Sequence, residues 1–491
     1  MIPEADERAS IRAGVLSGFA WKLVSQVTLQ IARFAGGITL ARFIAPVDYG
    51  RAGMALVFSS LVLVFADMAF GSTLVQRESV SERDRSTVFW LSLIGGCIFG
   101  SAGYLLAGSA ARLYGRDDVT PLLQALALTF PLAALGTVPA AMLGRSLDFR
   151  RLELRQIASS LIGIAAAVVV ATRGGGAWAI VVQQIASVAS STVILFALSR
   201  WLPRHGVSLA SARALAGFSG NVVLQRLLYY LHRNADNVLV GRYLGASALG
   251  AYTLAYNIML IPFNRISGVV QEVLFPAFAR MQAEPRRIAD LWLRSTRVVG
   301  TLSVPALLGL IVVAPDFVPV VLGPRWIGAT TVLQVLSWVG LMQSLQTSTT
   351  DVMLAVDRSE LVRSYSVGFF CAHLVAFVIG VQYGIVGVAV AYAISSTVVE
   401  PLQTVLACRA LGVSARGYFV GLRGVAEVGL LMLATVLAAR LVLLDATSLG
   451  PAARLVICSL LGMAATTVLV LWRVPEVMHE VRDLRRRRSE R

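Results

Sequence analysis

Five basic residues stand inside long apolar segments of this 491-residue chain, and their type and spacing indicate anion binding. They are Lys22, Arg33, Arg226, Arg233 and Arg265. A charge at membrane depth costs at least ~2.5–3.5 kcal/mol, so such a residue usually faces a partner or a water-filled cavity. Eleven residues separate the first two cations and seven separate the next two, so each pair shares one face of a helix. Because a guanidinium binds phosphate oxygens bidentately, we expect a hydrated cavity with positive walls that holds an anion.

Internal ion pairing is the competing interpretation of these cations. Asp236 lies about one helical turn from Arg233, so a salt bridge is a real alternative there. The first apolar segment contains no acid, which favours the cavity for Lys22 and Arg33. Three acids are candidates for ion coupling or for structural pairing: Asp67, Asp236 and Asp351.

The sequence carries no pattern typical of catalysis or metal binding. It has no HExxH, GxSxG or Walker loop, and its four cysteines form no CxxC. His232 and His373 could relay protons, although a single histidine in a membrane segment more often forms a packing hydrogen bond. We therefore expect no enzyme activity, no metal and no cofactor.

The elements that must position the cations are membrane helices. Hydrophobic residues make up 57% of the chain, charged residues only 14%, and the mean hydropathy is +0.74, whereas a soluble domain carries roughly 25% charged residues. At ~20 apolar residues per crossing, this composition suffices for about fourteen helices. The sequence thus predicts an all-α polytopic membrane protein with about 14 transmembrane helices, over residues 15–41, 52–75, 87–110, 119–143, 156–172, 176–199, 215–241, 246–275, 296–322, 327–355, 361–380, 384–407, 418–439 and 452–472.

The distribution of positive charge predicts the topology. With the N-terminus in the cytoplasm, the inner loops and ends hold 29 lysine and arginine residues and the outer loops hold nine. This asymmetry is typical of the positive-inside rule, so both termini are predicted to be cytoplasmic. The net charge of +16 therefore indicates membrane topology and not a nucleic-acid partner. The basic tail, residues 474–491, is expected to lie against anionic lipid headgroups.

A weak internal repeat relates the two halves of the chain. At an offset of 200 residues the identities are Arg33 with Arg233, Ala35 with Ala235, Arg42 with Arg242, Gly50 with Gly250, and Ala55 with Ala255. Duplicated halves around a central site are typical of transporters. The predicted organisation is a cytoplasmic segment (1–14), two pseudo-symmetric six-helix lobes (15–200 and 214–408), transmembrane helices 13 and 14 (418–473) and the basic tail.

Residues 234–280 resemble the bacterial polysaccharide exporters and oligosaccharide-lipid flippases of the multidrug/oligosaccharidyl-lipid/polysaccharide (MOP) exporter superfamily. The matching pieces are Asp236, Gly241 with Arg242, Gly245, the run Gly250–Tyr252 and the turn Leu274–Pro276. Residues 40–50, 69–77 and 323–326 are also similar to the family. These motifs are topological, so they identify a family and leave the saccharide open.

The resemblance implies a V-shaped pair of lobes around a cationic lumen in the bacterial cytoplasmic (inner) membrane. Such proteins move a polyprenyl-diphosphate-linked saccharide outward by alternating access, and the diphosphate is an anion that the predicted cavity could hold. The implied partners are the lipid-linked saccharide and membrane lipids, with glycosyltransferases or a polymerase of the same pathway as further candidates. No nucleotide-binding motif is present, so the expected driving force is an ion gradient, the membrane potential or substrate supply.

Two other function classes stay open. A drug or cation exporter of the same superfamily would be expected to use buried acids in its N-terminal half, where only Asp67 qualifies. A membrane glycosyltransferase or polymerase usually needs a large outer loop with acids or histidines, and no outer loop here is long enough.

Overall fold

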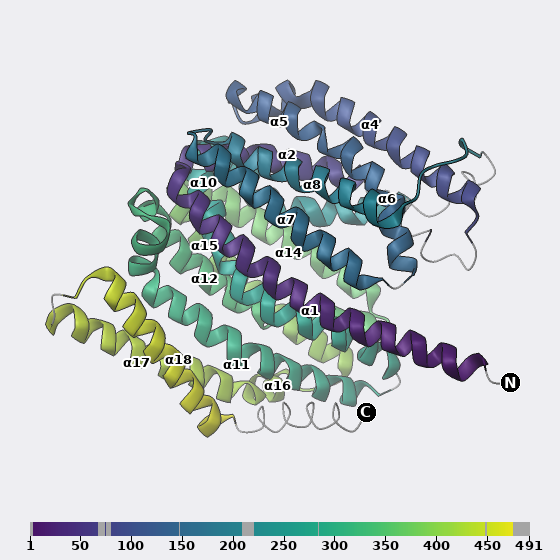
Figure 1. Ribbon diagram of the computed structural model, residues 1–491. Coiled ribbons are helices and arrows are strands. Elements are labelled where there is room, and N and C mark those ends of the chain that lie inside the picture. The colour runs from purple at the N-terminus through teal and green to yellow at the C-terminus, as the bar shows by residue number, and fades with distance from the viewer. Residues whose placement is uncertain are drawn as a thin grey trace. The chain divides into compact units, whose positions relative to one another are not determined.

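The computed structural model describes residues 3–66, 74, 80–146, 148–208, 220–282, 284–446 and 449–474. Throughout this part of the chain the regular secondary structure is helical, and it contains no strand (Figure 1). Nine stretches of the described residues are long and apolar enough to cross a membrane. The predicted all-α multi-pass fold is confirmed, while the count of 14 helices and the two-lobe arrangement stay predictions.

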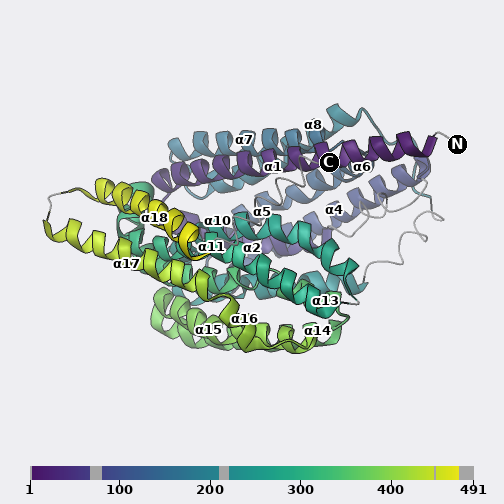
Figure 2. The same cartoon turned by 90° about the horizontal axis from the view of Figure 1, so that it is seen from below.

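The chain divides into two compact units, Met1–Gly250 and Ala251–Arg491. In the first unit α1 packs against α7, α7 against α8, and both α4 and α8 against α6. Figures 1 and 2 both show α1 running alongside α7. The helices of this unit are α1 (Pro3–Phe43), α2 (Pro46–Ala66), α4 (Glu82–Leu113), the short 3-10 helix η1 (Asp117–Val119), α5 (Thr120–Ala127), α6 (Thr129–Arg145), α7 (Phe149–Thr172), α8 (Trp178–Ser199) and the first part of α10 (Gly220–Arg280).

Local signals in the sequence define where these helices begin and how closely they approach. A capping box starts α4, because the Ser81 hydroxyl accepts from the Asp84 amide and the Asp84 carboxylate accepts from the Ser81 amide, both at 3.1 Å. The Asp148 side chain caps α7 in the same way, at 3.1 Å from the Arg151 amide. A Cβ on Gly163 would lie 1.9 Å from the Ser187 Oγ. Only glycine therefore allows α7 to approach α8 this closely.

Helices α2 and α10 also meet backbone to backbone within the first unit. A Cβ on Gly50 would lie 1.7 Å from the Ala246 carbonyl oxygen, and a Cβ on Gly250 would lie 2.0 Å from the Pro46 carbonyl oxygen. The same offset of 200 residues relates Gly50 to Gly250 and Pro46 to Ala246. The contact is therefore reciprocal, as in a helix pair related by a local two-fold axis.

In the second unit α11 packs against α12, α17 and α18, and both α12 and α14 pack against α15. Its helices are the rest of α10, α11 (Pro285–Phe317), the π-helix η3 (Val318–Leu322), the 3-10 helix η4 (Pro324–Ala329), α12 (Thr330–Ser344), α13 (Thr349–Ala355), α14 (Ser359–Gly380), the 3-10 helix η5 (Val381–Tyr383), α15 (Gly384–Leu411), α16 (Ala415–Gly421), α17 (Arg423–Ala446) and α18 (Pro451–Arg473).

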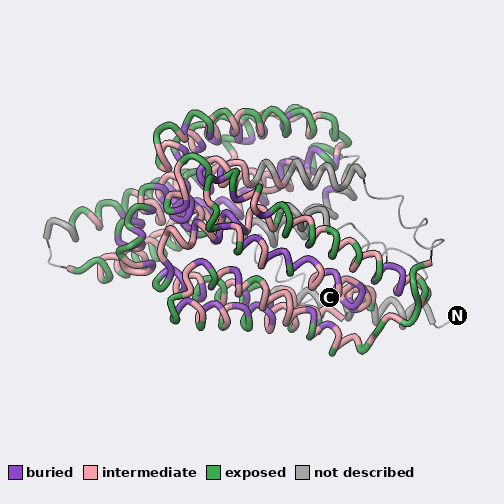
Figure 3. Tube along the Cα trace, turned by 90° about the horizontal axis from the view of Figure 1, so that it is seen from above, coloured by how far each residue is buried: buried purple, intermediate pink, exposed green. Residues whose placement is uncertain are grey.

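The exposed surface of many helices is apolar, as Figure 3 and the residue types show together. Leu105 on α4 is 78% exposed and Val468 on α18 is 64% exposed. In α18 only 6% of the most apolar window is buried, against 56% in the stretch Pro285–Leu322. Apolar surface on this scale would be unfavourable in water and is expected to face lipid.

The fourteen predicted stretches all overlap helices of the described chain. The predicted break between residues 241 and 246 falls inside α10, where Gly245 adopts φ 85° and ψ 179°. This left-handed conformation favours glycine, so one residue separates two helical segments without a long loop. The boundaries predicted for the lobes, the first cytoplasmic segment and the basic tail stay predictions.

Candidate functional site

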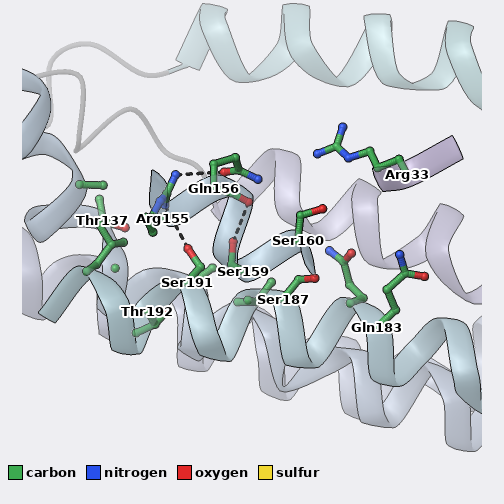
Figure 4. Close-up of a pocket in the computed structure, with 16 residues that line it drawn as sticks. Arg33, Thr137, Arg155, Gln156, Ser159, Ser160, Gln183, Ser187, Ser191 and Thr192 are labelled. Carbon is green, nitrogen blue, oxygen red and sulfur yellow. Dashed lines mark hydrogen bonds between the residues drawn. The ribbon is translucent and has the colours of Figure 1, made fainter. Parts of the chain in front are cut away.

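A polar cavity of about 530 Å³ lies among α1, α6, α7 and α8 of the first unit (Figure 4). Most of its wall consists of hydroxyl, amide and guanidinium side chains, although α6, α7 and α8 each lie in a stretch apolar enough to cross a membrane. The polar lining residues are Arg33, Thr137, Arg155, Gln156, Ser159, Ser160, Gln183, Gln184, Ser187, Ser191 and Thr192. The volume falls within the ~300–1,000 Å³ common for small-molecule sites.

Helical spacing brings these side chains to one place. On α8 the residues Gln183, Ser187 and Ser191 recur every four positions and therefore form a stripe along one face. On α7, Gln156 and Ser160 follow the same spacing, and Figure 4 shows both stripes bordering the cavity. The close approach of α7 and α8 thus sets two polar stripes side by side.

Arg155 is fixed into the cavity wall by hydrogen bonds. Its Nη1 donates to the Ser191 Oγ at 3.0 Å, and its Nη2 donates to the Gln156 Oε1 at 3.0 Å. The guanidinium therefore ties α7 to α8. A neighbouring hydroxyl, Thr192 Oγ1, ties α8 to α6 by donating to the Leu132 carbonyl at 2.7 Å.

Arg33 reaches the same cavity from α1 and is not fixed in this way. Figure 4 shows its side chain extending from the helix toward the space beside Ser160 and Gln156. The side chain is exposed, and its guanidinium makes no hydrogen bond or ion pair with any residue that the structure describes. All five of its N–H donors are therefore available to a ligand.

The charge of the lining is positive, with two guanidiniums and no carboxylate among the residues named for this cavity. Neutral amides and hydroxyls can both donate and accept, which suits a polyhydroxylated group. A free guanidinium suits a phosphate or carboxylate. This arrangement can therefore hold an anion next to a sugar-like group, and it offers no pair of groups for acid–base catalysis.

The structure describes some of the predicted site residues and not others. Lys22, half-buried on α1, does not line this cavity. The buried Asp236 accepts from the Asn237 amide at 2.7 Å, and Asp351 is half-buried in the first turn of α13. Outside the described residues lie Asp67 and the side chains of His232, Arg226, Arg233 and Arg265. That the five cations share one cavity stays a prediction.

Sequence reasoning missed most of the neutral lining. The topology count places Arg155 in an inner loop, whereas the residue lies in the first two turns of α7. Glutamines and serines recurring at intervals of four within apolar segments were the available signal, since a polar stripe on a membrane helix needs a polar environment. His373, by contrast, makes the expected packing hydrogen bond, at 2.9 Å from the Ser395 Oγ.

Comparison with known proteins identifies the family. Residues 39–331 match the polysaccharide biosynthesis protein family, which is more than half of the chain. The chain belongs to this family. Teichuronic acid biosynthesis protein TuaB of Bacillus subtilis (strain 168) is 30% identical over 79% of this chain and 81% of its own length. Lipopolysaccharide biosynthesis protein WzxC of Escherichia coli (strain K12) is 28% identical over 84% and 85%. Succinoglycan biosynthesis transport protein ExoT of Rhizobium meliloti (strain 1021) is 28% identical over 66% and 65%.

Solved structures show the same fold at low sequence identity. The lipid II flippase MurJ in an inward closed conformation superposes with a TM-score of 0.75 at 12% identity, covering 94% of this chain and all of that one. An inward-facing multidrug resistance MATE family transporter of the MOP superfamily gives 0.62 at 15% identity, covering 78% of this chain and 94% of that one. The family match and the relatives confirm the resemblance predicted from residues 234–280, and the solved structures show the fold.

Proposed function

We propose that this protein is a flippase or exporter that moves a polyprenyl-diphosphate-linked oligosaccharide or polysaccharide precursor across the bacterial inner membrane. The relatives support the saccharide class, since they include a succinoglycan biosynthesis transport protein. The polar cavity supports contact with the diphosphate and sugar, which are the polar part of the substrate and must leave water to cross the membrane. The polyprenyl tail is expected to stay in lipid, where its burial needs no protein cavity.

The observation that carries the proposal is the Arg33 guanidinium, which has no partner among the described residues and borders a cavity whose other cation, Arg155, is bonded to Ser191 and Gln156. A diphosphate is the anion of a lipid-linked saccharide, and arginine binds it by charge-assisted hydrogen bonds. The amides and hydroxyls of α7 and α8 are placed to contact the adjoining sugar. Lys22, Arg226, Arg233 and Arg265 are proposed to complete the cationic surface along the path.

Alternating access of two pseudo-symmetric lobes is the proposed mechanism. The reciprocal contact of Gly50 with Ala246 and of Gly250 with Pro46 supports a duplicated architecture. In such transporters the repeats move around a fixed site, so no nucleotide hydrolysis in the chain is needed. Asp67, Asp236 and Asp351 remain candidates for coupling that motion to an ion gradient.

A drug or cation exporter of the same superfamily is the second candidate, and the cavity disfavours it. An organic cation would need a carboxylate or an aromatic face, and the cavity lining offers two guanidiniums instead. A glycosyltransferase or polymerase would need an acid–base pair, which the cavity lining also lacks.

The test is flipping by the full chain in proteoliposomes, with a fluorescent polyprenyl-diphosphate oligosaccharide as the probe. Arg33→Ala is expected to slow flipping about tenfold or more, because hydrogen bonds to a charged group contribute ~1.5–3 kcal/mol. Arg33→Lys is expected to restore only part of the rate, since an ammonium cannot bind phosphate bidentately. Arg173→Ala, at the exposed end of α7, is the matched control. Wild-type flipping by Arg33→Ala would contradict the proposal.

A further inference from the structure

A second group of buried polar side chains lies in the second unit, on the face of α15 that packs against α12, α13 and α14. The buried face carries five polar residues over just more than three turns: Tyr392, Ser396, Glu400, Gln403 and Thr404. A continuous polar stripe at this depth is costly unless each group finds a partner.

Most of the hydrogen-bond donors in this group are already used. Gln343 Nε2 donates to the Tyr392 hydroxyl at 2.7 Å, and Gln346 Nε2 donates to the Thr404 hydroxyl at 2.7 Å. These two bonds tie α12 and the segment after it to α15 on either side of Ser396 and Glu400. Gln403 Nε2 donates to the Tyr365 hydroxyl on α14 at 3.0 Å.

Three oxygen-bearing groups are left without a partner within the described part of the chain. The Ser396 hydroxyl, fully buried, and the Gln343 Oε1 make no hydrogen bond there. The Glu400 carboxyl is only 9% exposed and has neither a hydrogen bond nor an ion pair with any described residue. Ser396 and Glu400 are one turn apart on α15, so their side chains are neighbours.

From these unpartnered oxygens we infer that Glu400, with Ser396 and Gln343, forms a binding site for one monovalent cation, H⁺ or Na⁺. A buried carboxylate without a counter-charge is strongly unfavourable, and one positive charge neutralises it. All three groups can accept or coordinate through oxygen, which is the ligand type that hard cations require. The site lies in the second unit and involves none of the residues of the Arg33 cavity.

Most other ionisable groups near α15 have hydrogen-bond or ion-pair partners or are more exposed than Glu400. α12 has no ionisable residue. The buried or half-buried ones on the neighbouring elements are Asp351 on α13, Tyr365 and His373 on α14, Arg297 and Asp316 on α11, and Tyr418 on α16, with Tyr392 and Cys408 on α15 itself. Arg297 donates to the Gly421 carbonyl at 2.8 Å, and the Tyr418 hydroxyl donates to Thr296 at 2.8 Å. Asp351 is therefore the only rival acid without a partner among the residues described here.

The experiment measures cation binding directly, with purified full-length protein in lipid nanodiscs and without a saccharide substrate. Binding of radioactive Na⁺ at pH 8 tests sodium, and an infrared titration of the protonated-carboxyl band tests the proton. We expect at least one signal in the wild type, its loss in Glu400→Gln, and no change in Glu360→Gln, an exposed acid at the start of α14. In the sodium case Ser396→Ala, which keeps the carboxylate, should weaken Na⁺ binding about tenfold, or ~1.4 kcal/mol.

The two signals distinguish Na⁺ from H⁺, and their absence or persistence can overturn the inference. Na⁺ binding lost in Glu400→Gln identifies sodium, whereas a protonated-carboxyl band lost without any Na⁺ binding identifies the proton. A wild type with neither signal, or signals that persist in Glu400→Gln and disappear in Asp351→Asn, would overturn the assignment. Because flipping is not measured, failure here leaves the proposed saccharide function untouched.

Discussion

The two arginines of the first-unit cavity differ in how their guanidiniums are held, and this difference separates structure from binding. Arg155 spans two helices through Ser191 and Gln156, so its donors serve the wall itself. Arg33 comes from a third helix and has no described partner. Removing the first should therefore affect folding, whereas removing the second should affect the ligand.

Substitution of Arg155 by alanine is expected to lower the free energy of unfolding by about 1–3 kcal/mol, because the half-buried acceptors Gln156 on α7 and Ser191 on α8 lose their donor. Arg33→Ala leaves no described group unsatisfied, so its effect should stay within about 0.5 kcal/mol. Denaturant unfolding in detergent, followed by tryptophan fluorescence, measures both. Equal losses in the two variants would show that Arg33 is also structural.

At the scale of helices, apolar runs and glycines in the sequence predict where the helices lie. They do not predict which side chains contact one another. The runs locate the helices because the bilayer fixes their length, and Gly245 marks the break inside α10. The cavity depends on which faces of α1, α6, α7 and α8 meet, which one sequence does not specify. The same holds for Glu400, whose neighbours come from helices up to 60 residues away in the chain.

Close helix approach at Gly50 gives a direct test of packing. Gly50→Ala places a methyl group 1.7 Å from the Ala246 carbonyl oxygen, so α2 and α10 must separate, at a cost of about 1–3 kcal/mol or more. Gly37→Ala is the matched control, because a Cβ there meets nothing within 4 Å, and alanine is the better helix former by about 0.5–1 kcal/mol. In thermal melts in detergent, the melting temperature should fall in Gly50→Ala and rise in Gly37→Ala. A similar melting temperature for both variants would refute the close contact.

A buried ion triad attaches α17 and α18 to α11. Asp316, 5% exposed, accepts from Arg440 at 3.1 Å and from Arg454 at 3.3 Å. Asp316→Asn leaves two half-buried guanidiniums without their counter-charge and should cost about 3–5 kcal/mol. Glu284→Gln breaks an exposed pair with Arg287 and should cost less than about 1 kcal/mol. Chemical denaturation of both variants gives the comparison, and a small effect of Asp316→Asn would show that apolar packing alone holds these helices.

For the whole molecule, ion pairs occur among the arginines assigned to both sides of the predicted membrane. Those assigned to the inner side and paired with acids are Arg85, Arg151, Arg287, Arg423 and Arg473. Several arginines assigned to outer loops are paired with acids: Arg51 with Asp48 and Asp118, Arg116 with Asp118, and Arg440 and Arg454 with Asp316. The hydrogen bond to Asp118 raises the pKa of the Arg116 guanidinium, which keeps it charged and paired. Since pairing occurs on both sides and the positive-inside rule counts lysine and arginine, not net charge, the ion pairs leave the predicted topology unchanged.

Topology can be tested with reporters at both sides of the predicted membrane. Cytoplasmic loops retain lysine and arginine because their translocation is unfavourable, so 29 basic residues on one side and nine on the other favour a single orientation. A reporter fused after Arg491 should be active only in the cytoplasm, and one inserted at Gly174, in the turn between α7 and α8, only outside. An even number of crossings places both termini on the same side. If Gly174 is external, an external signal from the fusion after Arg491 would require an even number of crossings between these two points, whereas fourteen helices place nine there.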